Sequence, residues 1–499
     1  MPSIRFVPRY YRYFGVLLFI AAGLLFFTRW SSRYDPPQTD LKTTAFTRLG
    51  RIREAKKGEL IFYFQNLERQ AREIGNDDRM LEYFSRFSSG DIDALSHLDT
   101  ELDIHYVTHY SDFYDILFVD TAGYIFHSIK RESDYHTNLR DGPLASTELV
   151  AQLGRADSDY FTGYTYYGPS DEPAAFFTTG VYRAGVLEGW FILQAPINVV
   201  NTILTDHQGL GRSGEVYLVN QDKLMLTESR FIEDATILKL KVDTRTVEMA
   251  LKATSGESVI RDYRGIKVFS SFEKFDLFST SWIIIAEIDE EEVFTDYYQE
   301  NKSYFQRELQ SFLERRFLHP QPLTNDADRV RRVDMNEFTR VLPGTVAQTY
   351  GVAACTGLAL MYPGRFGYLA HIAPTDEIYS HGRITRWSLA KRRTNMVDEI
   401  LRRMRRYDLL PSELQQLQVF IVAPHAIGFW GAVDRILANN MDLGNIRIMY
   451  NPRAVGVNIA LDVQDSTVQL EWYSDSFSYG EWGQEAETLS DIMKKVLRY

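Results

Sequence analysis

The sequence predicts an α+β fold behind an N-terminal membrane helix. One continuous apolar run extends from Tyr13 to Thr28, whereas the rest of the chain mixes polar and apolar residues. Beyond this run, long stretches with helical spacing, at 39–73 and 394–407, alternate with short stretches that have the apolar pattern of strands. Helices and antiparallel strands in separate stretches of the chain are typical of an α+β protein.

Length and charge limit the classes of function. A chain of 499 residues has room for roughly two to four domains. The net charge of −12 does not fit a protein that binds nucleic acid through a basic surface, so no nucleic-acid partner is expected. Cys355 is the only cysteine, which excludes a disulfide within the chain.

The apolar run from Tyr13 to Thr28 is expected to anchor the protein in a membrane. Its length is near the lower limit of the roughly 17–25 residues that cross a bilayer. Basic residues precede it, and those that follow are interspersed with aspartates, which favours a cytoplasmic N-terminus. No small-residue cleavage site follows, so an uncleaved anchor is favoured over a removed signal peptide. We therefore expect a single-pass protein of the inner (cytoplasmic) membrane, with tip and anchor at 1–34 and periplasmic residues after about 30.

Residues 35–297 contain an ordered series of predicted elements. A long helical stretch at 39–73 precedes a strand and turn ending at Gly123, a loop at 134–139, paired strands at 175–179 and 189–195, a helix at 197–208 and a strand at 282–287. Each element is a weak signal alone, but their order resembles the double Cache sensor domain of chemoreceptors. The resemblance implies two consecutive sheet-and-helix modules on a long stalk helix, and a role in chemotaxis or a related signal transduction system.

The same resemblance implies a small-molecule ligand in the membrane-distal module, between the sheet and its covering loops. The expected walls of this pocket are Tyr114, Phe118, Asp120, Tyr160, Tyr166, Phe176 and Phe177. At each aromatic position, packing in the core is the alternative. The arginine-plus-aromatic signature of amino-acid-binding members is not visible, so the ligand is not predicted.

Three other patterns have simpler interpretations. The glycines from Gly209 to Gly214 match a dinucleotide motif, but they follow a helix and precede a strand, so they predict a turn. His105 and His109 have helical spacing, yet they lie in a predicted loop without a metal motif, and no metal is expected. The basic stretch 383–406 is typical of a solvated helix face, with an acidic protein partner or lipid headgroups as alternatives.

Residues 298–322 are predicted to be a helical connector and linker. The helical spacing ends at a proline-containing stretch at 319–323. Such a connector would couple ligand occupancy to the placement of a domain at 323–499.

The chemistry of this last domain is predicted from a thiol and an imidazole. Cys355 begins a short apolar strand, Pro363 and Gly364 form a turn, and a second strand runs back through His371. With a turn at 362–364, the two residues are directly opposite, about 5 Å apart at Cβ. A slip of one residue would place them on opposite faces. His371 could then take the thiol proton or lower the pKa of Cys355 below about 8.5. An inert, buried cysteine is the alternative.

The pattern Thr349-x-Gly351-x-x-x-Cys355, followed by Gly367-x-x-Ala370-His371, resembles the CheD family of chemoreceptor glutamine deamidases over about 319–480. The resemblance implies an α/β-sandwich domain in which Cys355 is the nucleophile, His371 activates it and Thr349 orients the site, without a metal or organic cofactor. The chain departs from the family at 353–354, where two alanines replace glycine and serine, and in later glycine-rich stretches.

The implied reaction is attack of the Cys355 thiolate on a protein glutamine carboxamide, loss of ammonia and hydrolysis of the thioester by water that His371 activates. Two alternatives remain. A non-catalytic adaptor would use the CheD-like surface only to bind a partner in a signalling complex, and a thiol peptidase would cleave backbone instead. A homodimer is a further expectation, since membrane-anchored Cache domains with a long first helix commonly pair.

Overall fold

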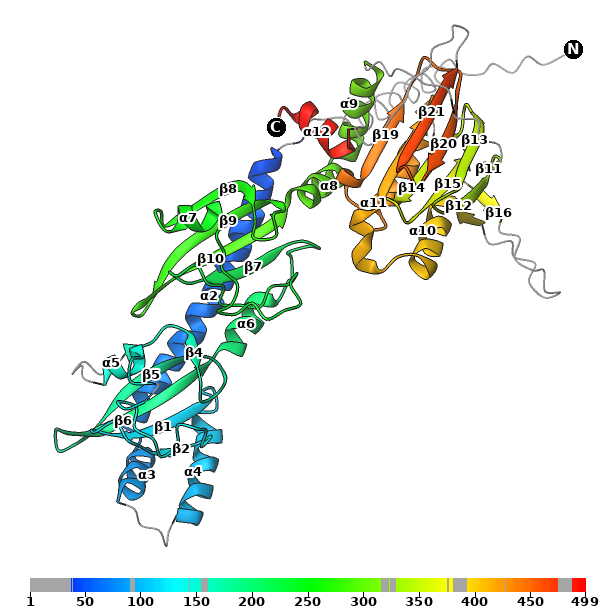
Figure 1. Ribbon diagram of the computed structural model, residues 1–499. Coiled ribbons are helices and arrows are strands. Elements are labelled where there is room, and N and C mark those ends of the chain that lie inside the picture. Colours follow the sequence, from blue (N-terminus) through cyan, green and yellow to red (C-terminus); the bar gives the residue numbers. More distant parts are fainter. Residues whose placement is uncertain are drawn as a thin grey trace, which may run out of the picture. The chain divides into compact units, whose positions relative to one another are not determined.

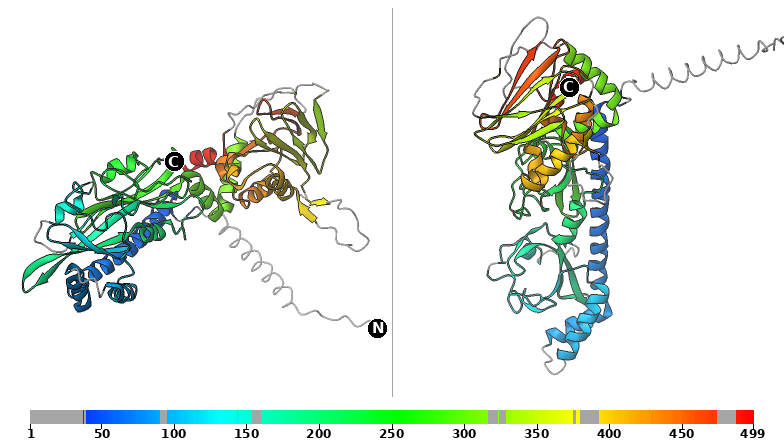
Figure 2. Two further views of the ribbon diagram at one scale, coloured as in Figure 1. Left: turned by 60° about the horizontal axis from the view of Figure 1, so that its bottom comes forward. Right: turned by 90° about the vertical axis from the view of Figure 1, so that its right-hand side faces the viewer.

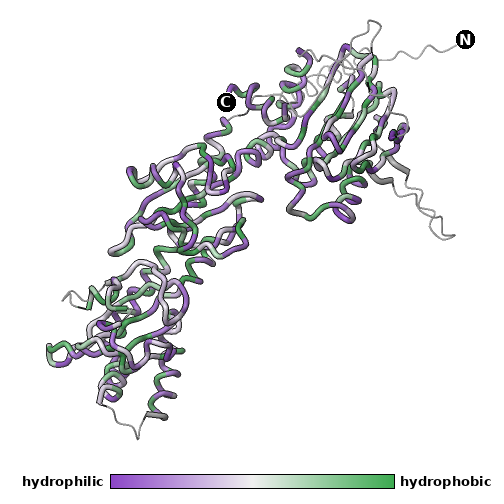
Figure 3. The backbone as a smooth tube through the Cα atoms, in the orientation of Figure 1, coloured by the Kyte–Doolittle hydropathy of each residue, from purple (hydrophilic) through white to green (hydrophobic). Residues whose placement is uncertain are grey.

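A computed structural model describes residues 37, 39–89, 95–142, 144–153, 160–315, 323, 329–374, 377–379, 393–426, 428–473 and 487–499. The predicted membrane helix from Tyr13 to Thr28 lies outside these residues. Within them, no helix has both the length and the apolar character needed to cross a bilayer, and Figure 3 shows hydrophobic and hydrophilic positions interspersed along the coloured chain. The chain divides into Lys42–Glu290, here called the N-terminal unit, and Glu291–Tyr499 together with the residues up to Leu41, the C-terminal unit.

The N-terminal unit is built on one long helix, α2 (Leu41–Ile74). Apolar residues three or four positions apart, including Leu60, Phe64 and Leu67, are fully buried, which gives the helix one continuous packing face. Phe64 lies edge-on to Trp282 at 5.3 Å between ring centroids, and Phe46 lies 5.2 Å from Phe269. In the right-hand view of Figure 2, α2 runs along both sheets of this unit.

The first module of this unit is an antiparallel sheet in the order β2-β1-β6-β5-β3, with β4 also paired to β5. Its strands are β1 (Asp115–Asp120), β2 (Ile125–Ser128), β3 (Tyr160–Phe161), β4 (Thr165–Tyr167), β5 (Glu172–Arg183) and β6 (Val186–Pro196). The helices beside it are α3 (Asp78–Ser88), α4 (Leu95–His109), α5 (Glu148–Gln152) and α6 (Ile197–Thr205). The predicted pairing of 175–179 with 189–195 is confirmed, because Ala175 lies opposite Ala195 and Thr178 opposite Ile192.

The second module is a sheet in the order β7-β10-β9-β8. Its elements are β7 (Glu215–Val219), α7 (Arg245–Ala250), β8 (Ser255–Arg261), β9 (Lys267–Leu277) and β10 (Thr280–Asp289). The glycines at 209–214 form turns before β7, as predicted. The prediction of a loop around His105 and His109 was wrong: both lie in α4, where Leu98, Leu102 and Tyr106 are buried at helical spacing.

The C-terminal unit contains two sheets that face each other. One has the order β11-β13-β20-β21, with β11 (Val330–Val333), β13 (Val346–Val352), β20 (Gly456–Asp462) and β21 (Thr467–Tyr473). The other has the order β12-β15-β14-β18-β19, with β12 (Glu337–Val341), β14 (Thr356–Tyr362), β15 (Phe366–Ile372), β18 (Gln418–Ala423) and β19 (Ile446–Tyr450). Apolar residues of both sheets, such as Ala359 and Ile459, form one core between them. The predicted sandwich and hairpin are therefore present (Figure 1).

Helices complete the C-terminal unit. They are α8 (Glu290–Glu300), α9 (Lys302–Glu314), α10 (Met396–Tyr407), α11 (Phe429–Leu437) and α12 (Leu489–Leu497), with a small hairpin of β16 (Glu377–Tyr379) and β17 (Arg393–Asn395) and short 3-10 helices at Pro411–Gln416 and Leu443–Asn445. The connector predicted at 298–322 is in part α8 and α9, which break at Asn301 and pack within this unit. For example, Leu443 donates its backbone N–H to Thr295 Oγ1 at 3.0 Å.

Candidate functional site

Cys355 lies where the chain passes from one sheet of the sandwich to the other. It ends the bend at 353–355 that joins β13 to β14, and it belongs to the core between the sheets. Only 8% of its surface is exposed, whereas the preceding Ala354 is exposed. The thiol therefore lies directly behind the surface of the sandwich.

A bulge at the end of β13 shapes the approach to Cys355. Thr349 pairs with Ile459 and Val352 with Val457, so β13 has one extra residue here. Gly351 supplies the left-handed backbone, with φ of +72°, and donates its N–H to Asn458 Oδ1 at 2.9 Å. The glycine of the Thr-x-Gly pattern thus has a conformational role beside the site.

His371 does not lie directly opposite Cys355, so the predicted register was wrong. The hairpin loop contains Pro363, Gly364 and Arg365, because Tyr362 pairs with Phe366. His371 therefore pairs with Gly357, two positions beyond Cys355. An offset of two residues keeps both side chains on the same face, the face directed toward the other sheet. The arrangement is diagonal rather than direct, so the two side chains share a face but no hydrogen bond joins the thiol to the imidazole.

Thr349 and His371 form the central contact of the site. Thr349 Oγ1 and His371 Nδ1 lie 2.9 Å apart and join the two sheets by a hydrogen bond. Thr349 is fully buried and His371 is 4% exposed. His371 Nε2 is buried and has no hydrogen-bond partner. With the proton on Nδ1, donated to Thr349, Nε2 has a free lone pair and can accept a proton.

Burial sets the charge state of both groups. It raises the pKa of the Cys355 thiol above its ordinary value. Burial also lowers the pKa of His371, and the negative charge of Asp334 offsets part of that change. The expectation of a lowered cysteine pKa was therefore wrong, because desolvation favours the neutral thiol. At neutral pH the pair consists of a thiol and a neutral imidazole, which suits general-base catalysis rather than a resting ion pair.

We expect the alkylation of Cys355 by iodoacetamide to accelerate continuously as the pH rises from about 6 to 9, since only the thiolate reacts and its pKa is raised. The rate can be followed by intact mass on the folded chain, with the urea-denatured protein as the control. Denaturation should accelerate the reaction at neutral pH. A plateau of fast alkylation at acidic pH would instead indicate a thiolate–imidazolium pair.

The structure does not bring the predicted ligand residues into one pocket. Phe118 packs against Phe84 and Phe191 on one face of the first sheet, and Phe176 packs against Tyr167 in the cluster on the other face. Phe177 contacts Phe113, Phe161 and Phe278.

The other candidates have separate surroundings. Asp120 accepts backbone N–H groups of the following turn, and Tyr114 donates to Glu132. Tyr166 is 63% exposed beside Asp171. The side chain of Tyr160 lies outside the described residues.

Asp134, in the loop predicted at 134–139, is a better candidate for a ligand contact in the first module than these residues. Asp134 is 3% exposed, and Oδ2 accepts a hydrogen bond of 2.5 Å from Tyr167. Its other oxygen, Oδ1, is buried without a partner. Burial raises its pKa. An unpartnered buried carboxylate oxygen costs free energy unless a ligand or water satisfies it, and this signal is invisible in the sequence.

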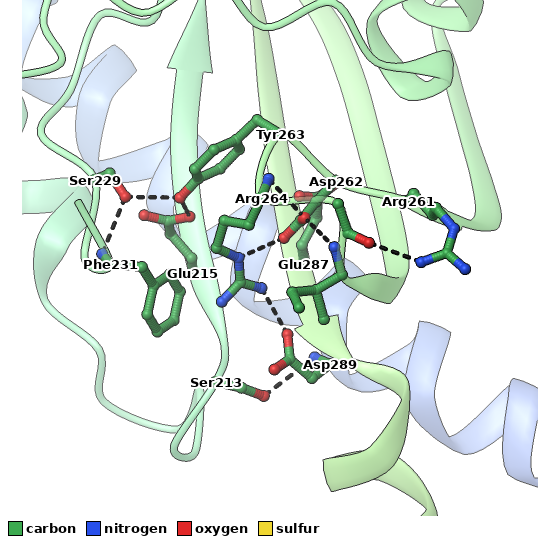
Figure 4. A network of polar contacts seen from close by, with 12 residues as sticks. Ser213, Glu215, Ser229, Phe231, Arg261, Asp262, Tyr263, Arg264, Glu287 and Asp289 are labelled. Carbon is green, nitrogen blue, oxygen red and sulfur yellow. Dashed lines mark hydrogen bonds and ion pairs between the residues drawn. The ribbon is translucent and has the colours of Figure 1, made fainter. Parts of the chain in front are cut away.

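The second module contains a larger buried polar network (Figure 4). Arg264 bridges Asp262 and Asp289, with distances of 2.6 Å to each carboxylate, and its guanidinium lies 4.0 Å from the Phe231 ring centroid. Glu287 is 2% exposed and accepts from Tyr217 at 2.9 Å. Its Oε1 has no partner, and burial raises its pKa to about 7. The network is expected to respond to pH.

No family model and no curated protein matches this sequence. Among solved structures, the chain is similar to an extracellular ligand binding receptor from Desulfohalobium retbaense, with 11% identity and a TM-score of 0.35 over 48% of this chain and 39% of that one. It is also similar to the periplasmic sensory domain of the Campylobacter jejuni chemoreceptor Tlp1, with 15% identity and a TM-score of 0.37 over 51% of this chain and 98% of that one.

A third similar structure is the ligand binding domain of the Pseudomonas aeruginosa amino acid chemoreceptor PctC in complex with GABA, with 15% identity and a TM-score of 0.36 over 50% of this chain and all of that one. These structural neighbours are extracellular or periplasmic sensory and ligand-binding domains, and each covers about half of the chain.

Proposed function

We propose that the C-terminal unit is a CheD-like deamidase that converts protein glutamine side chains to glutamate. The hydrogen bond between Thr349 Oγ1 and His371 Nδ1 is the observation that carries this proposal, because it leaves Nε2 buried and free on the face that Cys355 shares. A nucleophile, a base and a third group that orients the base are the parts that thiol-dependent acyl transfer requires.

In the proposed mechanism, the Cys355 sulfur attacks the carboxamide carbon while its proton passes to His371 Nε2. The tetrahedral intermediate collapses, the C–N bond breaks, and the departing nitrogen takes the proton from the imidazolium and leaves as ammonia. Water then loses a proton to His371 as it attacks the thioester, and the products are glutamate and the free thiol. Backbone N–H groups of the bend at 353–355 are the proposed donors to the oxyanion.

We also propose that the N-terminal unit binds a small molecule that regulates this activity. The unpartnered, buried Oδ1 of Asp134 supports a ligand site in the first module. The run from Tyr13 to Thr28 is the proposed anchor in the inner membrane, with the folded units on the periplasmic side, as its length and flanking charges favour.

The test is to incubate the purified full chain with a panel of glutamine-bearing peptides and to measure ammonia and a mass gain of about 1 Da at glutamine. Because Cys355 is the only cysteine, pretreatment with iodoacetamide blocks the proposed nucleophile selectively and is the matched control. Activity that is lost on alkylation supports the deamidase. Ammonia release that survives alkylation would contradict the proposal. The absence of ammonia release with every peptide would also contradict it and would favour the non-catalytic adaptor. Cleaved peptide bonds would indicate a peptidase.

Replacement of Thr349 by valine is expected to lower kcat about tenfold with little change in KM, because valine fills the same volume but cannot hold the His371 ring by a hydrogen bond. Thr349 is a positioning residue in this mechanism. The variant Thr349→Ser retains the hydroxyl and should recover most of the activity. Steady-state kinetics of the wild type, Thr349→Val and Thr349→Ser measure kcat and KM. An equal loss of kcat in both variants would contradict a role for the hydroxyl.

A further inference from the structure

A basic groove lies on the C-terminal unit between α10 and the edge strand β12. Its volume is about 790 Å³, and its walls include Arg331, Arg340, Arg402, Arg403 and Arg406. The predicted basic stretch 383–406 thus reaches this groove through α10, whereas its first part, 383–392, lies outside the described residues.

The groove is separate from the thiol site. Arg340 and Phe338 alternate with Thr339 along β12, and they pair with Tyr368 and Ala370 of β15. Tyr368 and His371 are an odd number of positions apart on the same strand, so their side chains point to opposite faces of the sheet. Phe338, Arg340 and Tyr368 therefore line the groove from the helix-covered face of this sheet, whereas Arg331 comes from β11 of the other sheet. The Cys355 site lies between the sheets.

The charges of the groove are unbalanced. Arg402 and Arg403 share the single carboxylate of Glu399, with distances of 2.6 and 3.0 Å. Arg340 pairs with Asp408, which is buried and also accepts from Tyr368 at 2.7 Å. Five guanidinium groups against these two carboxylates leave three positive charges. This surplus occurs in a protein whose net charge is −12, so the basic side chains are concentrated here.

Two of the arginines lie over aromatic rings. The Arg403 guanidinium lies 4.8 Å from the Phe338 ring centroid, and that of Arg406 lies 5.3 Å from the Tyr407 ring centroid. Arg331 and Arg406 form no ion pair with the carboxylates in the described part of the chain. A solvated helix face needs no such fixed positions, whereas a recognition site gains affinity from side chains that are ordered beforehand.

The strand beside these charges has a free edge. In the described residues, β12 ends the sheet β12-β15-β14-β18-β19 and pairs only with β15. The backbone groups on its other side are available to a further strand. An extended peptide added there would run along the groove and bring its side chains beside the arginines.

We propose that this groove binds an extended acidic segment of a partner protein, which adds as a strand to β12 and places its carboxylates against Arg331, Arg402 and Arg406. A hollow groove fits a peptide chain, whereas a flat bilayer surface does not enter it. The inference does not depend on the thiol chemistry, since none of the residues that line the groove belongs to the Cys355 site.

The test uses the purified full chain and a fluorescein-labelled peptide, Thr-Glu-Val-Glu-Thr-Glu-Val-Glu, with binding followed by fluorescence anisotropy. Replacing its glutamates by serine should abolish binding, and methylation of alternate backbone nitrogens should weaken it about tenfold because strand hydrogen bonds are lost. Arg331→Gln and Arg406→Gln should each weaken binding about tenfold. Arg405→Gln is the matched control, because Arg405 lies on the same helix and bonds instead to Asn439 O.

Circular dichroism of each variant shows whether the fold is retained, and these exposed substitutions are expected to leave it unchanged. Binding that is insensitive to Arg331→Gln and Arg406→Gln, or to backbone methylation, would overturn the proposal. Vesicles of phosphatidylserine and of neutral phosphatidylcholine are tested as competitors of the peptide. Displacement of the peptide by the phosphatidylserine vesicles alone would also overturn the proposal and would assign the groove to lipid headgroups.

Discussion

Replacing His371 by alanine is expected to lower the rate of glutamine deamidation about a thousandfold, close to the loss for Cys355→Ala itself. The thiol pKa is raised by burial, so almost no thiolate exists at neutral pH without a base. His371 Nε2 is the buried nitrogen that can accept the proton, and its lowered pKa keeps it neutral and competent.

The double variant Cys355→Ala/His371→Ala should be no less active than Cys355→Ala alone, because residues that act as one unit are not additive. The rate of ammonia release under single-turnover conditions is measured for His371→Ala, Cys355→Ala and the double variant. His207→Ala, an exposed histidine of the N-terminal unit, is the matched control and should keep full activity. If His371→Ala retained more than about a tenth of the wild-type rate, general-base catalysis by this residue would be excluded.

The hairpin that carries His371 could be predicted from sequence, but its register could not. Apolar strands on either side of Pro363 and Gly364 are a clear local signal. In the observed loop, the Arg365 guanidinium lies 5.0 Å from the Tyr362 ring centroid and donates to Glu413 and to Asp408 O. Partners that lie more than forty positions away in the sequence hold Arg365 in the loop, and local turn preferences do not contain that information.

The contact of Thr349 with His371 likewise depends on long-range structure. The two residues come from different sheets, and only the packing of β13 over β15 brings them together. The resemblance to a known family supplied this pair, whereas spacing alone supplied only the hairpin. The bulge that Gly351 permits is a second feature that sequence spacing did not predict.

The predicted ligand pocket is the opposite case, because the period of a β-strand alone excludes it. Phe176 and Phe177 are neighbours in a strand, so their side chains point to opposite faces and cannot line the same cavity. The same period places Leu117 and Phe118 on different faces of β1. Asp134 has no periodic signal, because it lies in a loop and becomes a candidate only through its burial and its unpartnered oxygen.

Replacing Glu287 by glutamine is expected to stabilise the N-terminal unit by about 3 kcal/mol at pH 8 and to have little effect at about pH 4. Burial raises the pKa of Glu287 from 4.5 to about 7, and the charges of Asp262 and Glu215 add to this effect, whereas hydrogen bonds from Ser270 and Tyr217 oppose it. The folded state therefore keeps a proton between pH 4.5 and about 7 that the unfolded state has lost. The contribution of Glu287 to the free energy of unfolding therefore falls as the pH rises through that window.

Thermal unfolding of the full chain, followed at several pH values, measures this effect. Glutamine keeps the acceptor for Tyr217 and cannot ionise, so the variant should unfold at a higher temperature than the wild type at pH 8, and the difference should shrink as the pH falls toward about 4.5. Glu257→Gln, an exposed glutamate on β8 of the same sheet, is the matched control and should show no such difference. An equal shift at every pH would mean that packing, rather than the ionisation of a buried carboxyl, determines the stability at this position.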